Sequence, residues 1–143
     1  MRDDDVKNLS AVRMEHAQEC LASAQQLLRS GDYKGSANRS YYAVFHAMRA
    51  VLAYDGIDMK RHSGIISEFR RLYIKPGILP EELSVIISEV FDVRTDCDYD
   101  DFYVISKEEV LAQAEKAERF LTVIQGFLEQ KNDMTRDSAE KYD

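Results

Sequence analysis

Apolar residues recur every three to four positions over five stretches of the chain, and this spacing constrains the fold more than any other feature. Such spacing places the apolar side chains on one face of an α-helix. Only 6 Gly and 2 Pro interrupt 143 residues, and no stretch alternates convincingly with a period of two. The sequence therefore predicts an all-α protein, an up-and-down bundle of four to five helices. The expected helices cover residues 10–29, 32–54, 61–73, from about 80 onward, and 106–130.

One domain is expected to occupy most of the chain, since 143 residues suit a single domain. The bundle is predicted at residues 10–130, with Ser10 as the N-cap of the first helix and Ser106 opening a capping box for the last. Residues 1–9 are expected to be frayed or disordered. The polar, aperiodic residues 131–143 are expected to be disordered as well.

The charge of the chain is acidic overall and unevenly distributed. The formal net charge is −7 at pH 7, which argues against a non-specific nucleic-acid binder, because such proteins carry an excess of Lys and Arg. Residues 60–75 hold five basic residues and one acid, whereas residues 92–101 hold five aspartates and one arginine. These opposed patches either steer association with a partner or a second copy, or are two solvated surfaces.

The sequence holds no signal for a membrane, a metal or a cofactor. Its first residues are acidic and polar, unlike a leader peptide, and no apolar run approaches about 18 residues. Cys20 and Cys97 stand apart and lack a metal-binding spacing, so we expect two reduced thiols in a cytoplasmic protein. No glycine-rich phosphate loop or zinc motif is present, so no metal and no cofactor is expected.

Arg94 interrupts the apolar face of the fourth predicted helix. The stripe that includes Ile87 and Val90 reaches Arg94 one turn later, and a guanidinium on a buried stripe is costly unless it is paired. Asp98 follows four residues on, so one interpretation is an ion pair within the helix. The other interpretation is an arginine that donates two parallel hydrogen bonds to a phosphate.

Further aromatic and basic residues extend this candidate site. Tyr99 and Tyr103 follow Arg94, and aromatic rings beside an arginine can stack on unpaired bases. Arg39 and His46 lie two helical turns apart on one face, where the histidine is either a general acid or base or a packed, hydrogen-bonded residue. The candidate nucleic-acid-binding or nucleotide-binding residues are Arg39, Lys60, Arg61, His62, Arg94, Asp98 and Tyr103.

Three segments resemble signature pieces of one known family. Residues 37–47, ANRSYYAVFHA, are similar to the NRxYYAxFHA signature of one branch of the HEPN family. Residues 60–64, KRHSG, resemble its K-x-H-x-G segment, and residues 94–100, RTDCDYD, resemble its R-x-x-x-D-Y segment. Three pieces in matching order make this resemblance fairly specific over about residues 10–130.

The resemblance implies a bundle of four or five helices that is commonly a homodimer. It also implies a minimal nucleotidyltransferase as partner, with which HEPN proteins form toxin–antitoxin pairs, and metal-independent ribonuclease activity in the active members. Their motif is an arginine followed by four to six residues and a histidine, which maps to Arg94. Tyr99 stands where that histidine is expected, and tyrosine titrates near pH 10, so it is a poorer base.

Three functions follow as hypotheses. The first is a dimeric HEPN module that binds RNA or a nucleotide and works with a nucleotidyltransferase. The second is an active ribonuclease toxin that uses Arg94 with Tyr99, or with His46. The third is an interaction-only dimer without a nucleic-acid ligand. If the protein works with a nucleotidyltransferase, as in the first hypothesis, the hydroxyl of Tyr99 or Tyr103 is a candidate for modification by that enzyme.

Overall fold

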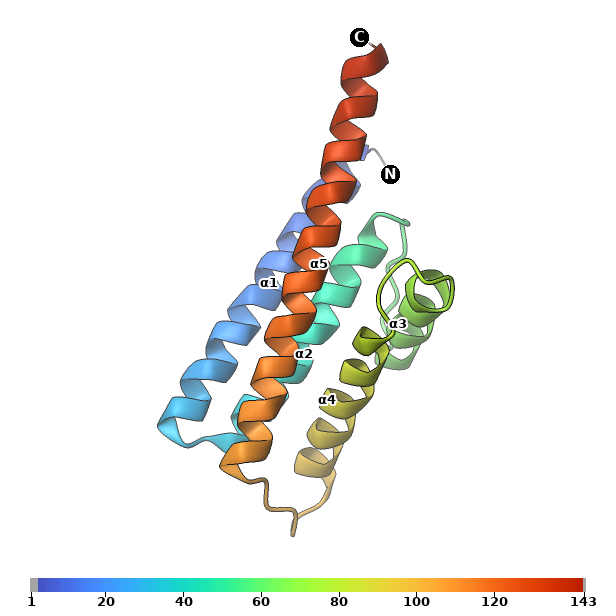
Figure 1. The fold of residues 1–143 in the computed structure, drawn as a ribbon. Coiled ribbons are helices and arrows are strands. Elements are labelled where there is room, and N and C mark those ends of the chain that lie inside the picture. The colour runs from blue at the N-terminus through green and yellow to red at the C-terminus, as the bar shows by residue number, and fades with distance from the viewer. Residues whose placement is uncertain (1–2, 143) are drawn as a thin grey trace.

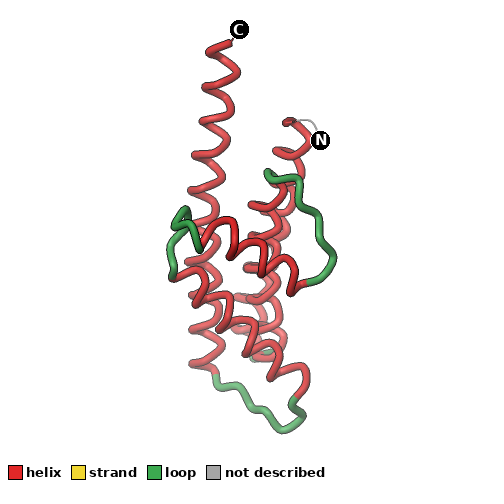
Figure 2. Tube along the Cα trace, turned by 90° about the vertical axis from the view of Figure 1, so that its right-hand side faces the viewer, coloured by secondary structure: helices red, strands yellow, loops and turns green. Residues whose placement is uncertain are grey.

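Five α-helices and one π-helical turn make up the described chain. The computed structural model describes residues 3–142, and side chains from residue 4 to residue 134. Four long helices run alternately up and down the bundle, and α3 crosses beside α4 (Figures 1 and 2). This arrangement confirms the predicted all-α bundle. The elements are α1 (Asp3–Ser30), α2 (Tyr33–Ala53), α3 (His62–Phe69), the π-helical turn η1 (Arg70–Ile74), α4 (Glu82–Tyr99) and α5 (Lys107–Tyr142).

The first and last helices are longer than the periodicity predicts. Helix α1 begins at Asp3, so Ser10 is a buried residue inside the helix and the prediction that it caps α1 is wrong. Asp4 and Asp5 in its first turn favour this earlier start, because negative charges near the N-terminus of a helix are stabilised by its dipole. Helix α5 continues past residue 130 to Tyr142. The expected disorder falls partly on residues 1, 2 and 143, which lie outside the described residues; the described parts of both segments are helical.

Polar caps fix the starts of α2 and α5. The carboxylate of Asp32 accepts a hydrogen bond from the backbone N–H of Gly35 and starts α2. The hydroxyl of Ser106 accepts from the backbone N–H of Glu109 at 3.1 Å and starts α5, which confirms the predicted role of Ser106. Such caps stabilise a helix by about 1 kcal/mol each.

Helix α2 is the centre of the molecule, because it contacts every other α-helix of the described chain. Its apolar residues Tyr41, Met48 and Leu52 are almost fully buried in the main core. Small side chains such as Ala43 and Ala47 are also fully buried and allow neighbouring helices to pack closely. A residue on the remaining, partly exposed edge of α2 is therefore held on a rigid element.

Helices α3 and α4 are tied together by Arg70. Its Nε donates to the hydroxyl of Ser84 at 3.0 Å, and its Nη2 donates to the Ser84 carbonyl and to the hydroxyl of Ser88. This bridge fixes the spacing between the two helices. Since His62 starts α3 and Arg94 belongs to α4, the bridge also positions both of these residues against α2.

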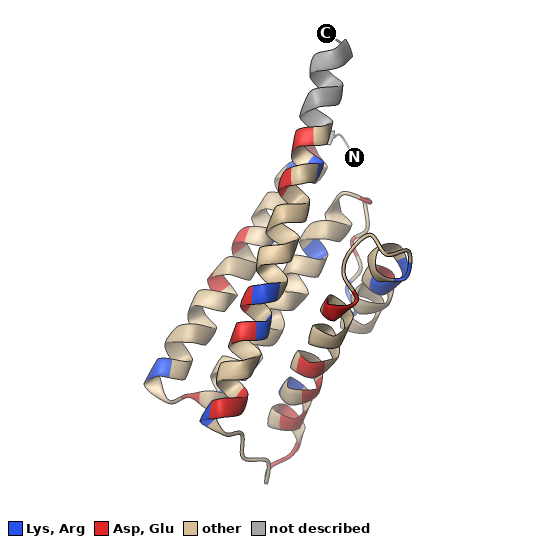
Figure 3. Cartoon of the chain, viewed as in Figure 1, with Lys and Arg blue, Asp and Glu red and all other residues tan. Residues whose placement is uncertain are grey.

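The two charge patches lie on different parts of the surface. The exposed basic residues are Lys60 and Arg61 just before α3, Arg71 in η1 and Lys75 just after η1. The five aspartates of residues 92–101 are exposed along the second half of α4 and the loop after it. Figure 3 shows the basic colour on η1, next to α3, and the acidic colour along α4. Both cysteines are free thiols. Among the described residues, no helix is long and apolar enough to cross a membrane.

Candidate nucleic-acid interface

The guanidinium of Arg94 lies on two tyrosine rings of α2. Its central carbon is 4.9 Å from the ring centre of Tyr41 and 5.5 Å from that of Tyr42. Its Nε is 3.0 Å from Oδ2 of Asp98, an ion pair whose geometry falls short of an aligned hydrogen bond. The first interpretation of Arg94, an ion pair with Asp98 within the helix, is confirmed. The second interpretation, a contact with a phosphate, stays a prediction, and the structure adds that the guanidinium lies over aromatic rings.

The outer nitrogens of Arg94 remain available to a ligand. Its side chain is 19% exposed, and neither Nη1 nor Nη2 hydrogen-bonds to a described residue. Asp98 satisfies only the charge on the Nε side, while the rings of Tyr41 and Tyr42 fix the plane of the group. A guanidinium held in this way presents two parallel donors, which is the geometry that binds a phosphate.

A second arginine, Arg39, lies over the ring of Tyr42. The central carbon of Arg39 is 5.2 Å from its ring centre, and Arg39 also donates to the side-chain carbonyl of the neighbouring Asn38 at 2.9 Å. Arg39 and Tyr42 are both half-buried. Two cations near one ring raise the local positive potential on a face of a protein that is acidic overall.

His62 closes the other side of the tyrosine pair. Its Nδ1 is 2.8 Å from the hydroxyl of Tyr41, which donates to it or accepts from it according to the tautomer of the ring. The His62 ring lies 4.1 Å from the ring of Phe45 and 5.8 Å from that of Tyr42, measured between centres. Burial lowers the pKa of His62, and the charges of Arg94 and Arg49 lower it further. Burial also raises the pKa of Tyr41 to about 12, so this hydroxyl keeps its proton at neutral pH.

His46 occupies the edge of the same aromatic cluster. Its ring packs against Tyr42 and Phe45 and makes an edge contact with His16, with ring centres 5.8 Å apart. Its Nδ1 is buried and has no hydrogen-bond partner among the described residues. Burial lowers the pKa of His46 to about 4, with further lowering from Arg49 and the other cations around it. The ring is therefore neutral at pH 7.

The remaining predicted site residues lie apart from this cluster. Tyr99 is the last residue of α4 and is 79% exposed, and helix geometry places it about 140° around the axis from Arg94. Tyr103 donates from its hydroxyl to Glu109 at 3.0 Å and packs against a small separate apolar cluster near the start of α5. Lys60 and Arg61 are exposed, and only their neighbour His62 reaches the tyrosines.

The sequence did not reveal Tyr41 and Tyr42 as the platform for Arg94. Tyr41 counts as an ordinary member of the apolar stripe of α2, and only the pairing of α2 with α4 brings its ring to the guanidinium. The adjacent Tyr-Tyr pair two residues after Arg39 was the available signal. Among the residues with described side chains, no group of His, Cys, Asp and Glu is arranged to hold a metal ion.

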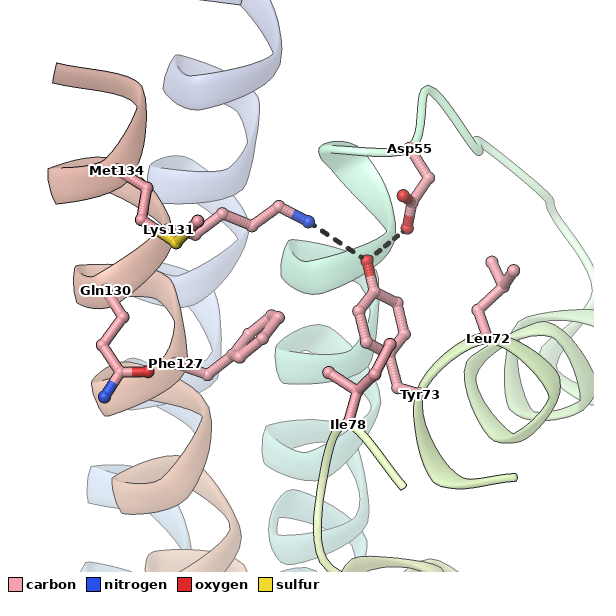
Figure 4. A pocket seen from close by; sticks show the side chains of 8 residues that line it. All are labelled: Asp55, Leu72, Tyr73, Ile78, Phe127, Gln130, Lys131 and Met134. Atoms are coloured by element: carbon pink, nitrogen blue, oxygen red, sulfur yellow. Dashed lines mark hydrogen bonds between the residues drawn. The ribbon is translucent and has the colours of Figure 1, made fainter. Parts of the chain in front are cut away.

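A cavity of about 570 Å³ lies at the other end of α2, between α5 and the turn after η1. In it the hydroxyl of Tyr73 donates to Asp55 at 2.5 Å and accepts from Nζ of Lys131 at 3.4 Å (Figure 4). The ammonium of Lys131 also lies 5.1 to 5.6 Å from three ring centres, those of Tyr54, Tyr73 and Phe127. These polar groups satisfy one another, so we interpret the cavity lining as an anchor for α5.

Comparison with known proteins agrees with the motifs. The family model of the HEPN domain matches residues 10–129. A "UPF0332 protein" of Thermotoga maritima is 34% identical over 79% of this chain and 86% of its own length. A protein of Methanocaldococcus jannaschii named "Putative toxin" is 33% identical over 83% of this chain and 81% of its own length. A second protein of that organism with the same description is 30% identical over 66% of this chain and 71% of its own length.

Proposed function

Since the chain belongs to the HEPN family, we propose that it is a toxin-type module that binds single-stranded RNA at the cluster of Arg94, Tyr41, Tyr42 and His62. The observation that carries the proposal is the Arg94 guanidinium, which is fixed on two rings while its outer nitrogens have no described partner. Two relatives with a toxin name support the toxin-type assignment.

The chemistry of the cluster suits one phosphate and one base. Arg94 supplies a planar donor pair for the phosphate oxygens. Tyr42 is half-buried, and Arg39 lies close to its ring, so an unpaired base can stack at this edge. Asp98 repels a second phosphate on its side and limits the contact to a small footprint. With one phosphate neutralised, the affinity should fall with salt with a logarithmic slope of about −0.7.

We also propose that the protein forms a homodimer and works with a nucleotidyltransferase partner. Its proposed location is the cytoplasm. A second copy placed over the partly exposed edge of α2 would bring two Arg94 residues to one seam. Light scattering after gel filtration measures this directly: a mass twice that of one 16.5 kDa chain is expected. A single-chain mass at micromolar concentration would contradict the dimer but leave RNA binding by each copy to be measured separately.

Of the two candidate tyrosines for modification, we propose Tyr99 as the one that a nucleotidyltransferase would use. Tyr99 is 79% exposed, whereas the Tyr103 hydroxyl is held by Glu109 and its pKa is raised to about 12, mainly by burial and this hydrogen bond. Mass spectrometry of protein co-expressed with such an enzyme should place a nucleotide adduct on Tyr99. An adduct on Tyr103 or none at all would contradict this assignment.

RNA binding is tested by fluorescence anisotropy with a labelled single-stranded RNA, using Arg94→Ala and Arg119→Ala as a matched pair. Each variant removes one arginine that is ion-paired to an acid, but Arg119 lies on α5 with Glu82 and outside the cluster. Losing a charge-assisted phosphate contact should weaken binding at least tenfold in Arg94→Ala, about 1.4 kcal/mol or more. Arg119→Ala should stay within about twofold. Equal weakening in the two variants would refute the assigned site.

Ribonuclease activity is a second candidate, and the position of His62 favours it. With Nδ1 oriented by Tyr41, Nε2 of His62 can take the proton of a ribose 2′-hydroxyl. The 2′-oxygen then bonds to the adjacent phosphorus, the bond from phosphorus to the 5′-oxygen breaks, and the imidazolium returns the proton to that oxygen. Arg94 would stabilise the charge on the phosphorane.

Cleavage is measured on RNA in the presence of a chelator, with a substrate that carries one 2′-deoxy nucleotide as control. The expected products are a 2′,3′-cyclic phosphate and a 5′-hydroxyl end. His62→Gln should abolish cleavage, whereas Tyr99→Phe should retain it because Tyr99 lies away from Arg94. If the wild type does not cleave RNA, or if His62→Gln still cleaves it, the proposed ribonuclease activity of His62 is refuted. The proposal of RNA binding is unaffected by either result.

A further inference from the structure

A groove runs between α3 and α4, next to the Arg94 cluster. Its volume is about 480 Å³, and its lining includes three serines, Ser63, Ser67 and Ser88, together with Arg70, Phe91 and Asp92. This volume lies in the range of small-molecule sites. The groove therefore has room for a ligand of the size of a nucleotide.

The groove is continuous with the site already described. Ser63 directly follows His62 in α3. On the α4 side, the ring centre of Phe91 lies 5.9 Å from that of Tyr41, and Phe91 precedes Arg94 by three residues on the same helix. If a strand of RNA is bound at Arg94, its neighbouring nucleotide therefore lies next to the groove.

Arg70 gives the far end of the groove a fixed positive charge. Its Nε and Nη2 are held by Ser84 and Ser88, which fixes the plane of the guanidinium. Its Nη1 hydrogen-bonds to no described residue. Hydroxyl groups from α3 lie along the same groove. A donor that is held in place before binding costs little entropy when an anion arrives.

The opposite end of the groove offers different chemistry. Phe91 is 37% exposed, so part of its ring can be covered by a base. Asp92 contributes an exposed carboxylate, which repels a phosphate but accepts a hydrogen bond from a ribose hydroxyl. Charge and polarity thus match the order of groups in one nucleotide, with the phosphate at Arg70 and the sugar and base at Asp92 and Phe91.

We propose that the groove between α3 and α4 binds the nucleotide on the 5′ side of the one whose phosphate is held at Arg94, so that the protein recognises single-stranded RNA as a dinucleotide step. The inference rests on the proposed RNA binding and extends it by a second subsite. In this subsite the base lies against Phe91, the 2′-hydroxyl donates to Asp92, and the phosphate accepts from Nη1 of Arg70 and from the hydroxyl of Ser67. The 2′-hydroxyl contact favours RNA over DNA.

The test compares uridine 5′-monophosphate with the 5′-phosphorylated dinucleotide pUpU in NMR titrations of the intact protein. The monophosphate should shift amide signals around Arg94 and Tyr42 only. The dinucleotide should also shift signals along residues 63–70 and 88–92, and should bind at least about fivefold more tightly, since one base stacked on an aromatic ring contributes that much or more.

Two variants test the groove, and a third serves as their control. In Phe91→Leu, which keeps an apolar contact with Tyr41, the affinity ratio of dinucleotide to monophosphate should fall to about two or less. Ser67→Ala, at an exposed helical position where folding is not at risk, should lower the same ratio. Phe102→Leu makes the identical exchange at a ring that is 93% exposed in the loop before α5, and its ratio should equal that of the wild type.

The outcomes separate this inference from the proposal on which it rests. If the monophosphate shifts signals around Arg94 but the ratio is unchanged in Phe91→Leu and Ser67→Ala, the groove is not a nucleotide subsite and RNA binding at Arg94 stands. If neither ligand shifts any signal around Arg94, the proposed function fails and the subsite with it. A dinucleotide of deoxyuridine that binds as tightly as pUpU would overturn the role given to Asp92.

Discussion

Lowering the pH from 7 to 4 should destabilise the protein through His46. Its ring is half-buried, its Nδ1 has no described partner, and arginines surround it. Burial and these charges lower its pKa from 6.5 to about 4. Between these two pKa values His46 binds a proton in the unfolded chain but not in the folded chain. The free energy of unfolding therefore falls as the pH drops from about 6.5 to about 4.

The size of the effect follows from the shift in pKa. Each unit corresponds to 1.36 kcal/mol, so a drop from 6.5 to about 4 sets an upper limit of about 3.4 kcal/mol once the ring is fully protonated. Solvent screening at a half-buried position reduces this to about 1–2 kcal/mol. Above pH 6.5 both states carry a neutral ring, and His46 contributes no further dependence on pH.

Urea unfolding of the wild type and of His46→Gln at pH 7, 6, 5 and 4.5 measures the effect. Carboxylates titrate in both proteins, so their contribution cancels in the difference between the two curves. The free energy of unfolding should fall more steeply with acid in the wild type, by about 1 kcal/mol or more between pH 7 and 4.5. His62→Gln, at the other histidine with a lowered pKa, serves as a comparison. Parallel curves for wild type and His46→Gln would refute the reasoning.

Two further stability predictions concern ties between helices. Tyr73→Phe removes the hydrogen bond to Asp55 at 2.5 Å and should lower the free energy of unfolding by about 1–2 kcal/mol, measured in urea at pH 7; an unchanged midpoint would contradict the role of this bond. Arg13 is 4% exposed, and Arg13→Met removes its guanidinium, which joins α1 to the Arg49 carbonyl and to Asp58. We expect a loss of about 1–3 kcal/mol, smaller than for a fully buried pair because Asp58 is 67% exposed, and a rise in melting temperature would contradict it.

The helices were predictable because their signal is local. A period of 3.6 residues marks each buried face, and Ser106 followed three residues later by Glu109 marks the start of α5. Ser10 looked like a cap by the same local rule. It is instead a buried residue of α1, because the acidic turn before it continues the helix, and no pattern in the apolar stripe reveals that extension.

Only the contacts of the site that lie within one helix could be predicted from the sequence. Asp98 lies one turn after Arg94, so their ion pair follows from spacing alone. The rings under Arg94 come from α2, and the histidine beside them comes from α3. These contacts depend on how three helices pack, which sequence spacing does not encode. The motif spacing implied by the family resemblance pointed instead to Tyr99, which is exposed at the end of α4.

The side-chain NMR signals of Arg94 test the central claim most directly. Arg94→Lys assigns these signals by their loss, and the protein is then titrated with a single-stranded RNA. We predict that the Nε and Nη signals of Arg94 shift in proportion to bound RNA, and that Arg94→Lys binds the same RNA at least fivefold more weakly, because lysine lacks the planar donor pair. RNA that binds while the Arg94 signals stay unchanged would contradict the account.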